Sequence, residues 1–290
     1  SNLLNCKITL PAIYDVALNA VDVDRIYNDG NTYDATKLDT SNHLVGWWVM
    51  TNPLSALDLV AANTGTLTNM DGTNRSTVTP GGGSLTSLSF DGSTEYVNMG
   101  NVLSLERTNA FSLSAWIKTT GTDGVILGKM QNVSPWRGYA LATMNGKLRV
   151  ELVNTTSGNW IAVRSETLIN DNLWHHVLVT YDGSSTAAGA TLYIDGTAQT
   201  PVVEQNSLSS TIVTTNNFRI GSRDGGWNFT GLITEAAVWQ KQLTSPEVTA
   251  VYNSGSPPDL KTLSTSGYLT AYWKLGDVYL YDAAKSPTVA

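Results

Sequence analysis

The chain has 290 residues and a formal net charge of −7, and only 14% of its residues are charged. This negative balance argues against nucleic-acid binding, which relies on Lys and Arg to neutralise phosphates. No run reaches the roughly 18 apolar residues of a membrane span, so membrane insertion is not expected. A single cysteine, Cys6, leaves no disulfide framework within the chain, and stability must come from an apolar core.

The N-terminal part, residues 1–43, predicts a strand around Lys7–Asp15, a short helix from Asn19 to Gly30, and a linker. An opening strand follows over Leu44–Met50. The next polar stretch, residues 63–87, has the composition of a loop and is expected to lie over one sheet.

Apolar and polar residues alternate with a period of two across the centre of the chain, which is typical of strands with one buried face. Asn145-Gly146 and Asp195-Gly196 supply the positive φ angles that tight hairpins need. Many short strands with regular turns indicate an antiparallel two-sheet sandwich. The predicted strands cover residues 111–118, 125–129, 139–143, 147–152, 160–164, 174–181, 191–194, 218–221 and 231–239.

One helix is predicted after the last of these strands, over residues 244–252. Thr244 supplies a capping hydroxyl, and Glu247 lies in the first turn, where a carboxylate is favourable. Gly255 is expected to end the helix in a left-handed conformation. Pro257-Pro258 then begins a linker that runs to about Gly267.

The two ends of the chain repeat each other. Residues 13–50 and 238–275 align without a gap at an offset of 225 (Tyr252 minus Tyr27), with 11 identities in 38 pairs. Self-similarity at a fixed period indicates an array of modules. The predicted division is therefore residues 1–43 as the end of a preceding module, 44–255 as one complete domain, and 256–290 as a linker and the first strand of a following module.

Three ordered segments carry a family resemblance. Residues 88–97 read LSFDGSTEYV, residues 174–196 contain WHHV, TYDG and LYIDG, and residues 231–243 contain a closing strand. Together they resemble the concanavalin A-like lectin/glucanase superfamily, in the form of a laminin-G-like module, across roughly residues 44–255. The resemblance implies an all-β, antiparallel two-sheet jelly roll with short helical and linker pieces at both ends.

The repeated ends carry a second resemblance. Each has Tyr-Asn-x-Gly-x-x-x-Asp followed by a Trp-Trp or Tyr-Trp strand, beginning at Tyr27 and Tyr252. This pairing is similar to modules in structural proteins of tailed bacteriophages. It implies a virion-surface or extracellular location, and partners that are other subunits of a particle or filament, with the chain in a homo-oligomer.

Aromatic residues in predicted loops are the best signal of a binding site. Trp136, Trp160 and Trp227 each lie in a polar turn, and indole faces stack on the apolar faces of sugar rings. Neighbouring Arg, Asp and Asn side chains can bond sugar hydroxyls. The alternative is that these tryptophans seal sheet edges or subunit contacts. The expected carbohydrate-binding residues are Trp136, Arg137, Trp160, Arg223, Asp224, Trp227 and Asn228.

A calcium ion is implied by the fold resemblance, because relatives of this fold often hold one with Asp, Asn and backbone oxygens. Asp91, Asp182 and Asp224 are the expected ligands. Each stands beside glycine, in a turn or close to one, and an Asp-Gly pair can also be turn chemistry alone.

Catalysis is not expected. A glucanase on this fold would need paired carboxylates, and Glu151, Glu166 and Glu235 are isolated in the sequence, with no E-x-D-x-x-E pattern. His175 and His176 point to opposite faces of their strand, so they cannot act together, and one is expected to be packed and the other exposed.

Three functions remain open. The first is a non-enzymatic virion-surface structural protein, such as a phage decoration, fibre or tail component, in which the spare strand of residues 1–30 pairs with an incomplete sheet of the same chain or a neighbour. The second is a carbohydrate-binding adhesion module of a secreted or cell-surface bacterial protein. The third is a polysaccharide hydrolase.

Overall fold

Two compact units make up the chain, residues 1–53 with 278–290 and residues 54–277. The structure is a computed structural model that describes residues 12–27, 44–47, 66–70, 74–76, 80 and 86–276. Cys6 and the first part of the predicted N-terminal strand lie outside these residues. In the described residues no helix is both long enough and apolar enough to span a bilayer.

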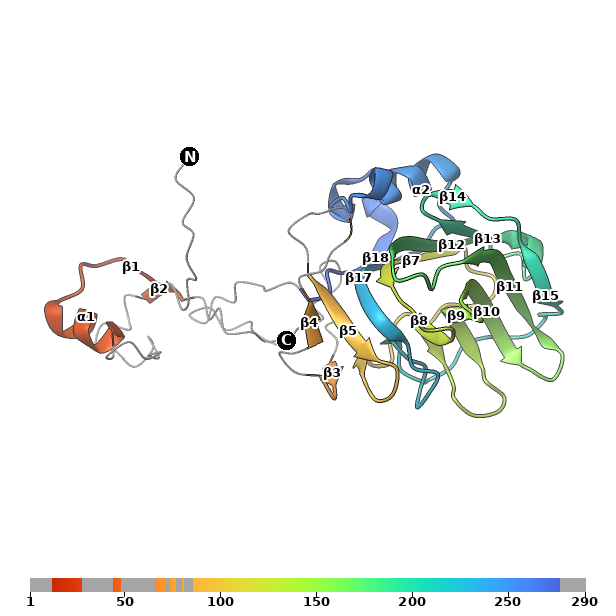
Figure 1. The fold of residues 1–290 in the computed structure, drawn as a ribbon, viewed down its shortest axis with the longest axis horizontal. Helices are drawn as coiled ribbons and strands as arrows, with labels where there is room; N and C mark the ends of the chain where they lie inside the picture. The colour runs from red at the N-terminus through yellow and green to blue at the C-terminus, as the bar shows by residue number, and fades with distance from the viewer. Residues whose placement is uncertain are drawn as a thin grey trace. The chain divides into compact units, whose positions relative to one another are not determined.

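The larger unit is a sandwich of two antiparallel sheets (Figure 1), which confirms the predicted fold class. The front sheet has the order β15 (Val202–Asn206), β11 (Asn159–Leu168), β10 (Lys147–Thr155), β9 (Gly138–Met144), β8 (Gly124–Met130), β16 (Arg219–Ile220), β6 (Tyr96–Asn98) and β3 (Thr66–Thr68). The back sheet has the order β14 (Thr197–Ala198), β13 (Ala190–Ile194), β12 (Trp174–Tyr181), β7 (Phe111–Lys118), β17 (Thr230–Trp239), β5 (Ser87–Asp91) and β4 (Arg75–Ser76), and β18 (Leu269–Trp273) also pairs with β17.

The core lies between the two sheets and follows directly from the period-two alternation. Leu148, Val150 and Leu152 of β10 are fully buried in it, so the residues between them point to the outer surface of the front sheet. Burying one such side chain contributes about 1.5 to 3 kcal/mol. The alternation therefore sets which side chains of the front sheet are available for a surface site.

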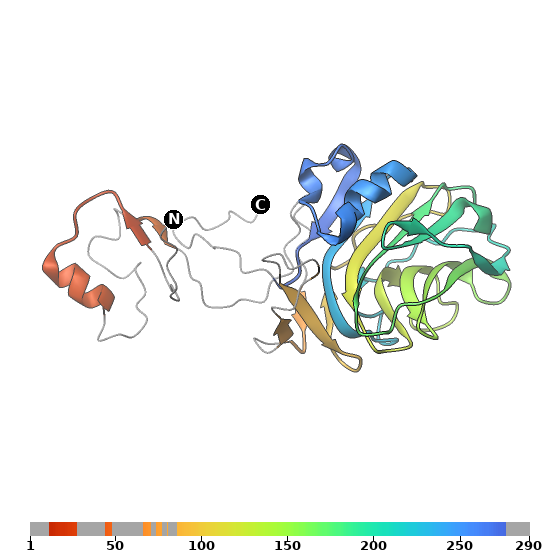
Figure 2. The same cartoon turned by 45° about the horizontal axis from the view of Figure 1, so that its top comes forward.

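The outer surface of the back sheet is covered by helix α2 (Ser245–Tyr252) and the turns that follow it (Figure 2). Val248, Val251 and Leu260 are buried there against Leu178 and Tyr272 of the sheet. The prediction of a linker over Pro257 to Gly267 is therefore wrong, because this stretch contains buried Leu260 and two short 3-10 turns.

Two local predictions also need correction. Helix α2 ends at Tyr252, and its C-cap is Asn253, not Gly255: Asn253 takes the left-handed conformation with a φ of 47° because asparagine tolerates it. Gly255 also has a positive φ, of 93°, but lies two residues further on. The polar stretch 63–87 is not one loop: its described residues include β3, which pairs with β6, and β4, which pairs with β5.

The smaller unit contains β1 (Ala12–Tyr14), helix α1 (Ala20–Tyr27) and β2 (Leu44–Trp47), and β1 pairs with β2. The spare N-terminal strand thus pairs with the opening strand of its own copy of the repeat. The predicted boundaries at 43 and 255 stay predictions, but strand pairing groups the elements differently, since β2 joins the N-terminal unit and β18 joins the sandwich.

Candidate functional site

A small apolar floor lies on the outer surface of the front sheet. Its buried members come from β8, β9 and β10, and Val153 belongs to it because Val153 alternates with core residue Leu152. Trp136, Trp160 and Trp227 are half-buried and pack against this floor. The structure thus brings together the three tryptophans that the sequence singled out. The floor consists of Val125, Met130, Ala140, Ala142 and Val153.

Two of these tryptophans lie on strained backbone. Trp136 has a φ of 64° and Trp227 a φ of 55°, in the left-handed region that bulky residues rarely adopt. The surrounding loops hold them there: Asp224 donates its N–H to the Met130 carbonyl at 3.2 Å, and Gln131 donates to the Arg137 carbonyl at 3.0 Å. Such strain gathers at functional sites more often than elsewhere.

The Arg223 guanidinium lies between two indoles. Its central carbon is 4.5 Å from the Trp136 ring centroid and 4.8 Å from that of Trp227, and its Nε donates to Asn132 Oδ1 at 2.9 Å. Burial lowers the pKa of Arg223; Glu151 opposes this shift and Arg149 adds to it. We call Trp136, Trp160, Trp227 and Arg223 the tryptophan platform.

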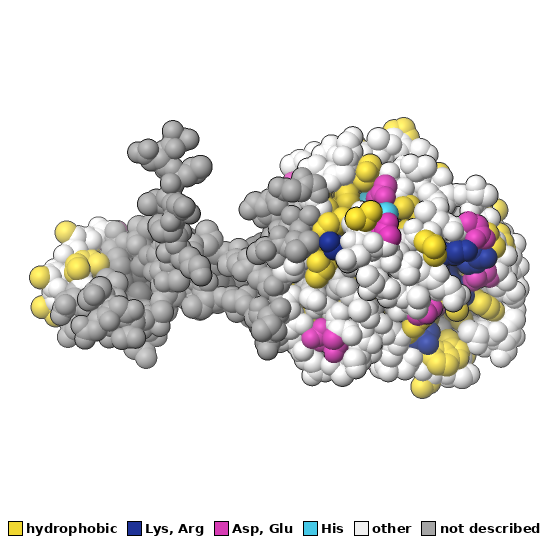
Figure 3. All heavy atoms as spheres, in the orientation of Figure 1, with side chains coloured by type: hydrophobic (Ala, Val, Ile, Leu, Met, Phe, Trp, Pro, Cys, Tyr) yellow, Lys and Arg dark blue, Asp and Glu magenta, His cyan; other side chains and the backbone are white. Residues whose placement is uncertain are grey.

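A network of buried ion pairs borders the platform. Arg149 and Glu151 are 4% and 6% exposed, although both point away from the core. Arg149 pairs with Glu151, and its Nε lies 2.7 Å from Glu204 Oε2. Burial lowers the pKa of Arg149, but the Glu151 and Glu204 carboxylates outweigh it and raise the pKa overall. Figure 3 shows acidic and basic side chains together in one patch of the domain surface, with hydrophobic atoms beside them.

This network was not predicted from the sequence, although the three glutamates do lack the paired carboxylates of an E-x-D-x-x-E pattern, as expected. Glu151 pairs with Arg149, Glu166 pairs with Lys147 and Arg164, and Glu235 accepts a hydrogen bond from the Tyr272 hydroxyl. A signal was present, because alternation places Lys147, Arg149 and Glu151 on the surface that carries Val153. The ion pairs could not be predicted from alternation alone, because they also depend on the pairing of β10 with β11 and of β11 with β15.

The remaining predicted site residues act mainly as loop anchors. Asp224 forms an ion pair with Arg219 at 2.6 Å, and the Arg219 guanidinium lies 4.3 Å from the Tyr96 ring centroid. Asn228 donates its amide to the Ser93 carbonyl, and Arg137 donates Nε to the Asn154 carbonyl at 3.5 Å. These bonds fix the loops that carry Trp136 and Trp227.

Each of the three expected calcium ligands has a partner within the described residues, and a calcium ion stays a prediction. Asp91 Oδ1 accepts the N–H groups of Ser93 and Thr94 at 2.7 and 2.9 Å. Burial raises the Asp91 pKa, but the bonds from Ser93, Thr94 and Glu95 together outweigh it and lower the pKa overall. Asp182 accepts the Ser184 N–H at 2.8 Å, and Asp224 is paired with Arg219. Within the described part of the chain, no group of three His, Cys, Asp or Glu residues could hold a metal.

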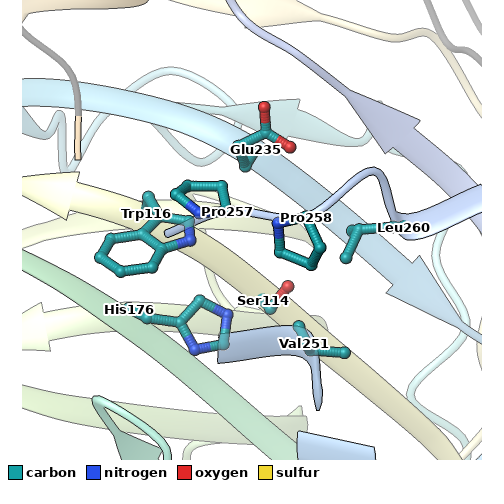
Figure 4. Close-up of a pocket in the computed structure, with 8 residues that line it drawn as sticks. All are labelled: Ser114, Trp116, His176, Glu235, Val251, Pro257, Pro258 and Leu260. Carbon is teal, nitrogen blue, oxygen red and sulfur yellow. The ribbon is translucent and has the colours of Figure 1, made fainter. Parts of the chain in front are cut away.

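The two histidines have different surroundings on the back sheet. His176 is 1% exposed, with its ring centroid 5.3 Å from Trp116 and 6.0 Å from Tyr252, and burial lowers its pKa to about 4. Figure 4 shows His176 with Trp116, Pro257 and Pro258 around one small cavity. A bond to Asp195 at 2.7 Å raises the pKa of His175. The pair is thus a packed and an ion-paired histidine, without a shared site.

Comparisons with known proteins agree with this fold. The Laminin_G_3 family model, described as the concanavalin A-like lectin/glucanases superfamily, matches residues 91–249. The adhesion G-protein coupled receptor V1 of Danio rerio is 25% identical over 166 residues, which is 55% of this chain but only 3% of that receptor.

Two solved structures have a similar fold and a low sequence identity to this chain. A heptameric SAP-like pentraxin from Limulus polyphemus is 17% identical, with a TM-score of 0.43 over 57% of this chain and 80% of that one. Domain 4 of an extracellular arabinanase from Geobacillus stearothermophilus, in complex with arabinotriose, is 18% identical, with a TM-score of 0.46 over 65% and 88% of the two chains. On the family match, the chain belongs to the concanavalin A-like lectin/glucanases superfamily.

Proposed function

We propose that this chain is a carbohydrate-binding adhesion module and that the tryptophan platform holds the sugar. The observation that carries the proposal is the position of Arg223 between Trp136 and Trp227, above a buried apolar floor. Half-buried indole faces offer stacking surface to a sugar ring, and the guanidinium offers hydrogen-bond donors beside it. The same combination on a fully buried surface would be packing alone.

The charge at the platform favours a sugar that carries a carboxylate. Arg149, Arg164 and Arg219 each have a carboxylate partner within ion-pair distance. Among the described residues, Arg223 has none and bonds only Asn132 through Nε. Guanidinium binds carboxylate through two parallel hydrogen bonds, so uronic or sialic acid units match Arg223 better than neutral sugars do.

A glycan array with matched neutral and acidic oligosaccharides tests this proposal. We expect the wild-type chain to retain acidic glycans, Trp227→Ala to lose retention, and Arg223→Gln to lose the preference for acidic over neutral glycans. Tyr268→Ala is the matched control, because Tyr268 is 52% exposed and lies outside the platform. The proposal fails if the wild type retains no glycan, or if Tyr268→Ala weakens retention as much as Trp227→Ala.

A second candidate function is favoured by the strand–helix–strand repeat at the two ends. We propose that the chain is a structural subunit on an extracellular or particle surface, where the glycan site acts in adhesion; the tailed-phage virion stays a prediction. Copies that assemble should sediment as discrete oligomers whose abundance rises with concentration. The absence of catalysis also stays a prediction, and release of reducing sugar from a retained glycan would contradict it.

A further inference from the structure

The described parts of the two copies of the repeat share their element starts and their strand register. Strand β1 begins 225 residues before the last three residues of β17, α1 begins 225 residues before α2, and β2 begins 225 residues before β18. The pair β1–β2 and the pair β17–β18 also have a bulge at the same position. The paired residues are Ala12 with Trp47, Ile13 with Gly46 and Tyr14 with Leu44 in the first copy, and Ala237 with Tyr272, Val238 with Ala271 and Trp239 with Leu269 in the second.

The helix caps are equivalent as well. Asn19 accepts the Asp22 N–H at 2.9 Å and donates its amide to the Asp22 carboxylate at 2.7 Å. In the second copy, the Thr244 N–H and hydroxyl both donate to Glu247, at 2.8 and 3.0 Å. Asn19 and Asp22 lie 225 positions before Thr244 and Glu247, so the same two positions bond each other at both helix starts, although the backbone atoms involved differ.

The surroundings of the two copies differ. Val248 of α2 is 0% exposed against the back sheet, whereas the equivalent Val23 of α1 is 54% exposed. In the described residues β1 and β2 form a two-stranded sheet, and two strands on their own are marginally stable in water. Among the described residues, Val23 thus lacks the burial of its counterpart Val248, and β2 has β1 as its strand partner.

Strand β18 fills a slot at the edge of the sandwich. Its only strand neighbour in the described residues is β17. Trp273 is fully buried and stacks on Phe218 with ring centroids 5.6 Å apart, and Tyr272 packs under α2. If β18 left the slot, the surfaces that Trp273 and Tyr272 cover would face water. A chain that releases β18 therefore needs another strand in its place.

Strand β2 resembles β18 in this slot at three positions and differs at others, among them Trp47 in place of Tyr272, whose hydroxyl bonds Glu235. Leu44 and Trp48 are identical to Leu269 and Trp273, and Gly46 stands at the position of Ala271. The match ends at Thr51, because the equivalent Gly276 has a φ of +87° and a side-chain carbon there would lie 2.6 Å from the Ser87 carbonyl oxygen. A β2 strand in the slot would follow the path of β18 as far as Met50 and then leave it.

We propose that β2 of a second copy of this chain occupies the slot beside β17 and that the displaced β18 pairs with β1 of that second copy. The exchange keeps the number and register of strand pairs unchanged, so side-chain packing in the slot and the concentration of the chain decide its extent. A head-to-tail contact of this kind joins copies into open chains or rings. The inference gives the assembly candidate a mechanism and is independent of glycan binding.

Cysteine cross-linking in the full chain, with Cys6→Ser as background, tests the exchange. Directly opposed residues in antiparallel strands have Cα atoms at disulfide distance. Val238→Cys with Gly46→Cys should give a ladder of covalent oligomers on oxidation, because these residues become partners only after exchange. Val238→Cys with Ala271→Cys is the matched control and should close within one chain. Val238→Cys with Val21→Cys measures random collision and should give no ladder.

Two outcomes overturn the proposal. One is a Val238–Gly46 variant that stays uncross-linked while the Val238–Ala271 control closes; the other is a Val238–Gly46 link within a single chain. Gly46→Pro in the cysteine-free chain gives an independent measurement, because it removes the backbone N–H of Gly46 from β2 and changes no residue of the sandwich. We expect sedimentation to show loss of oligomers with unchanged sandwich unfolding, and undiminished oligomers would contradict the exchange. Glycan retention is measured separately, so each proposal can fail alone.

Discussion

The outer surfaces of the front and back sheets each carry a basic side chain among aromatic rings. On the front sheet Arg223 lies between Trp136 and Trp227, and on the back sheet His176 lies beside Trp116 and Tyr252. The front group is half-buried and open to solvent. The back group is sealed, with Trp116 and His176 at 3% and 1% exposure.

The difference comes from helix α2, which covers the back sheet, whereas no described helix packs on the floor of the front sheet. Capping by Thr244 and Glu247 starts this helix, and Val248 and Val251 anchor it. Residue types alone do not separate the two surfaces, since both are rich in tryptophan. We therefore expect back-surface changes to affect stability and front-surface changes to affect binding.

The largest expected effect is on the back surface. Trp116→Ala should lower the free energy of unfolding by about 3 to 5 kcal/mol, because it removes a buried aromatic side chain and leaves a cavity. Urea denaturation followed by tryptophan fluorescence measures this loss. The matched change Trp136→Ala should cost about 1 kcal/mol, since Trp136 is only half-buried; equal losses would break the distinction between sealed and open surfaces.

Acid should act through the same sealed histidine. The folded-state pKa of His176 lies at about 4 against 6.5 for an unperturbed group, so the unfolded chain binds the proton more readily. The stability from neutral His176 is therefore full above pH 6.5 and is lost as the pH falls toward 4, an effect on the order of 3 kcal/mol. His176→Phe should flatten the unfolding free energy over this interval in urea titrations at several pH values.

His175 provides the opposite control for this pH dependence. Its pKa is raised by Asp195, so its stabilising contribution is full below pH 6.5 and is lost as the pH rises through the raised pKa. His175→Gln should therefore weaken the fold more at pH 5 than at pH 8. A His175→Gln chain that loses more stability at pH 8 would contradict this assignment.

On the open surface the expected effect is on affinity. Trp136→Ala should weaken binding of the acidic glycan retained on the array by about 10-fold, equivalent to about 1.4 kcal/mol, through loss of stacking. Isothermal titration calorimetry measures this change. The back-surface variant His176→Phe should bind like the wild type. A Trp136→Ala chain with wild-type affinity would remove the front tryptophans from the binding site.

The smallest expected effect sharpens the role of the cover. Thr244→Ala should lower the unfolding free energy of the sandwich by about 1 kcal/mol, because the helix loses its N-terminal cap. The equivalent change in the first copy, Asn19→Ala, should leave sandwich unfolding unchanged, because Asn19 belongs to the smaller unit. Hydrogen exchange of the α2 amides compares the two variants, and equal effects would contradict the assignment of α2 as the cover.

Much of the fold could be predicted from short-range patterns. Alternation located the core strands, Asp-Gly and Asn-Gly pairs located hairpins, and the cap at Thr244 placed α2 to within one residue of its start. The site could be predicted in part, since loop aromatics pointed to Trp136, Trp160 and Trp227. The ion pairs of Arg149 with Glu151 and Glu204 could not, because Arg149 and Glu204 come together only when β11 lies between β10 and β15.

The sequence by itself determined the strands, the turns and the repeat, because these depend on side-chain period and on residues a few positions apart. Only the tertiary structure decided which aromatic group is open and which is sealed, and that β18, not β2, fills the slot beside β17. The physical reason is that burial depends on what covers a surface. Contacts between segments that are far apart in the chain decide whether each of the two surfaces is covered.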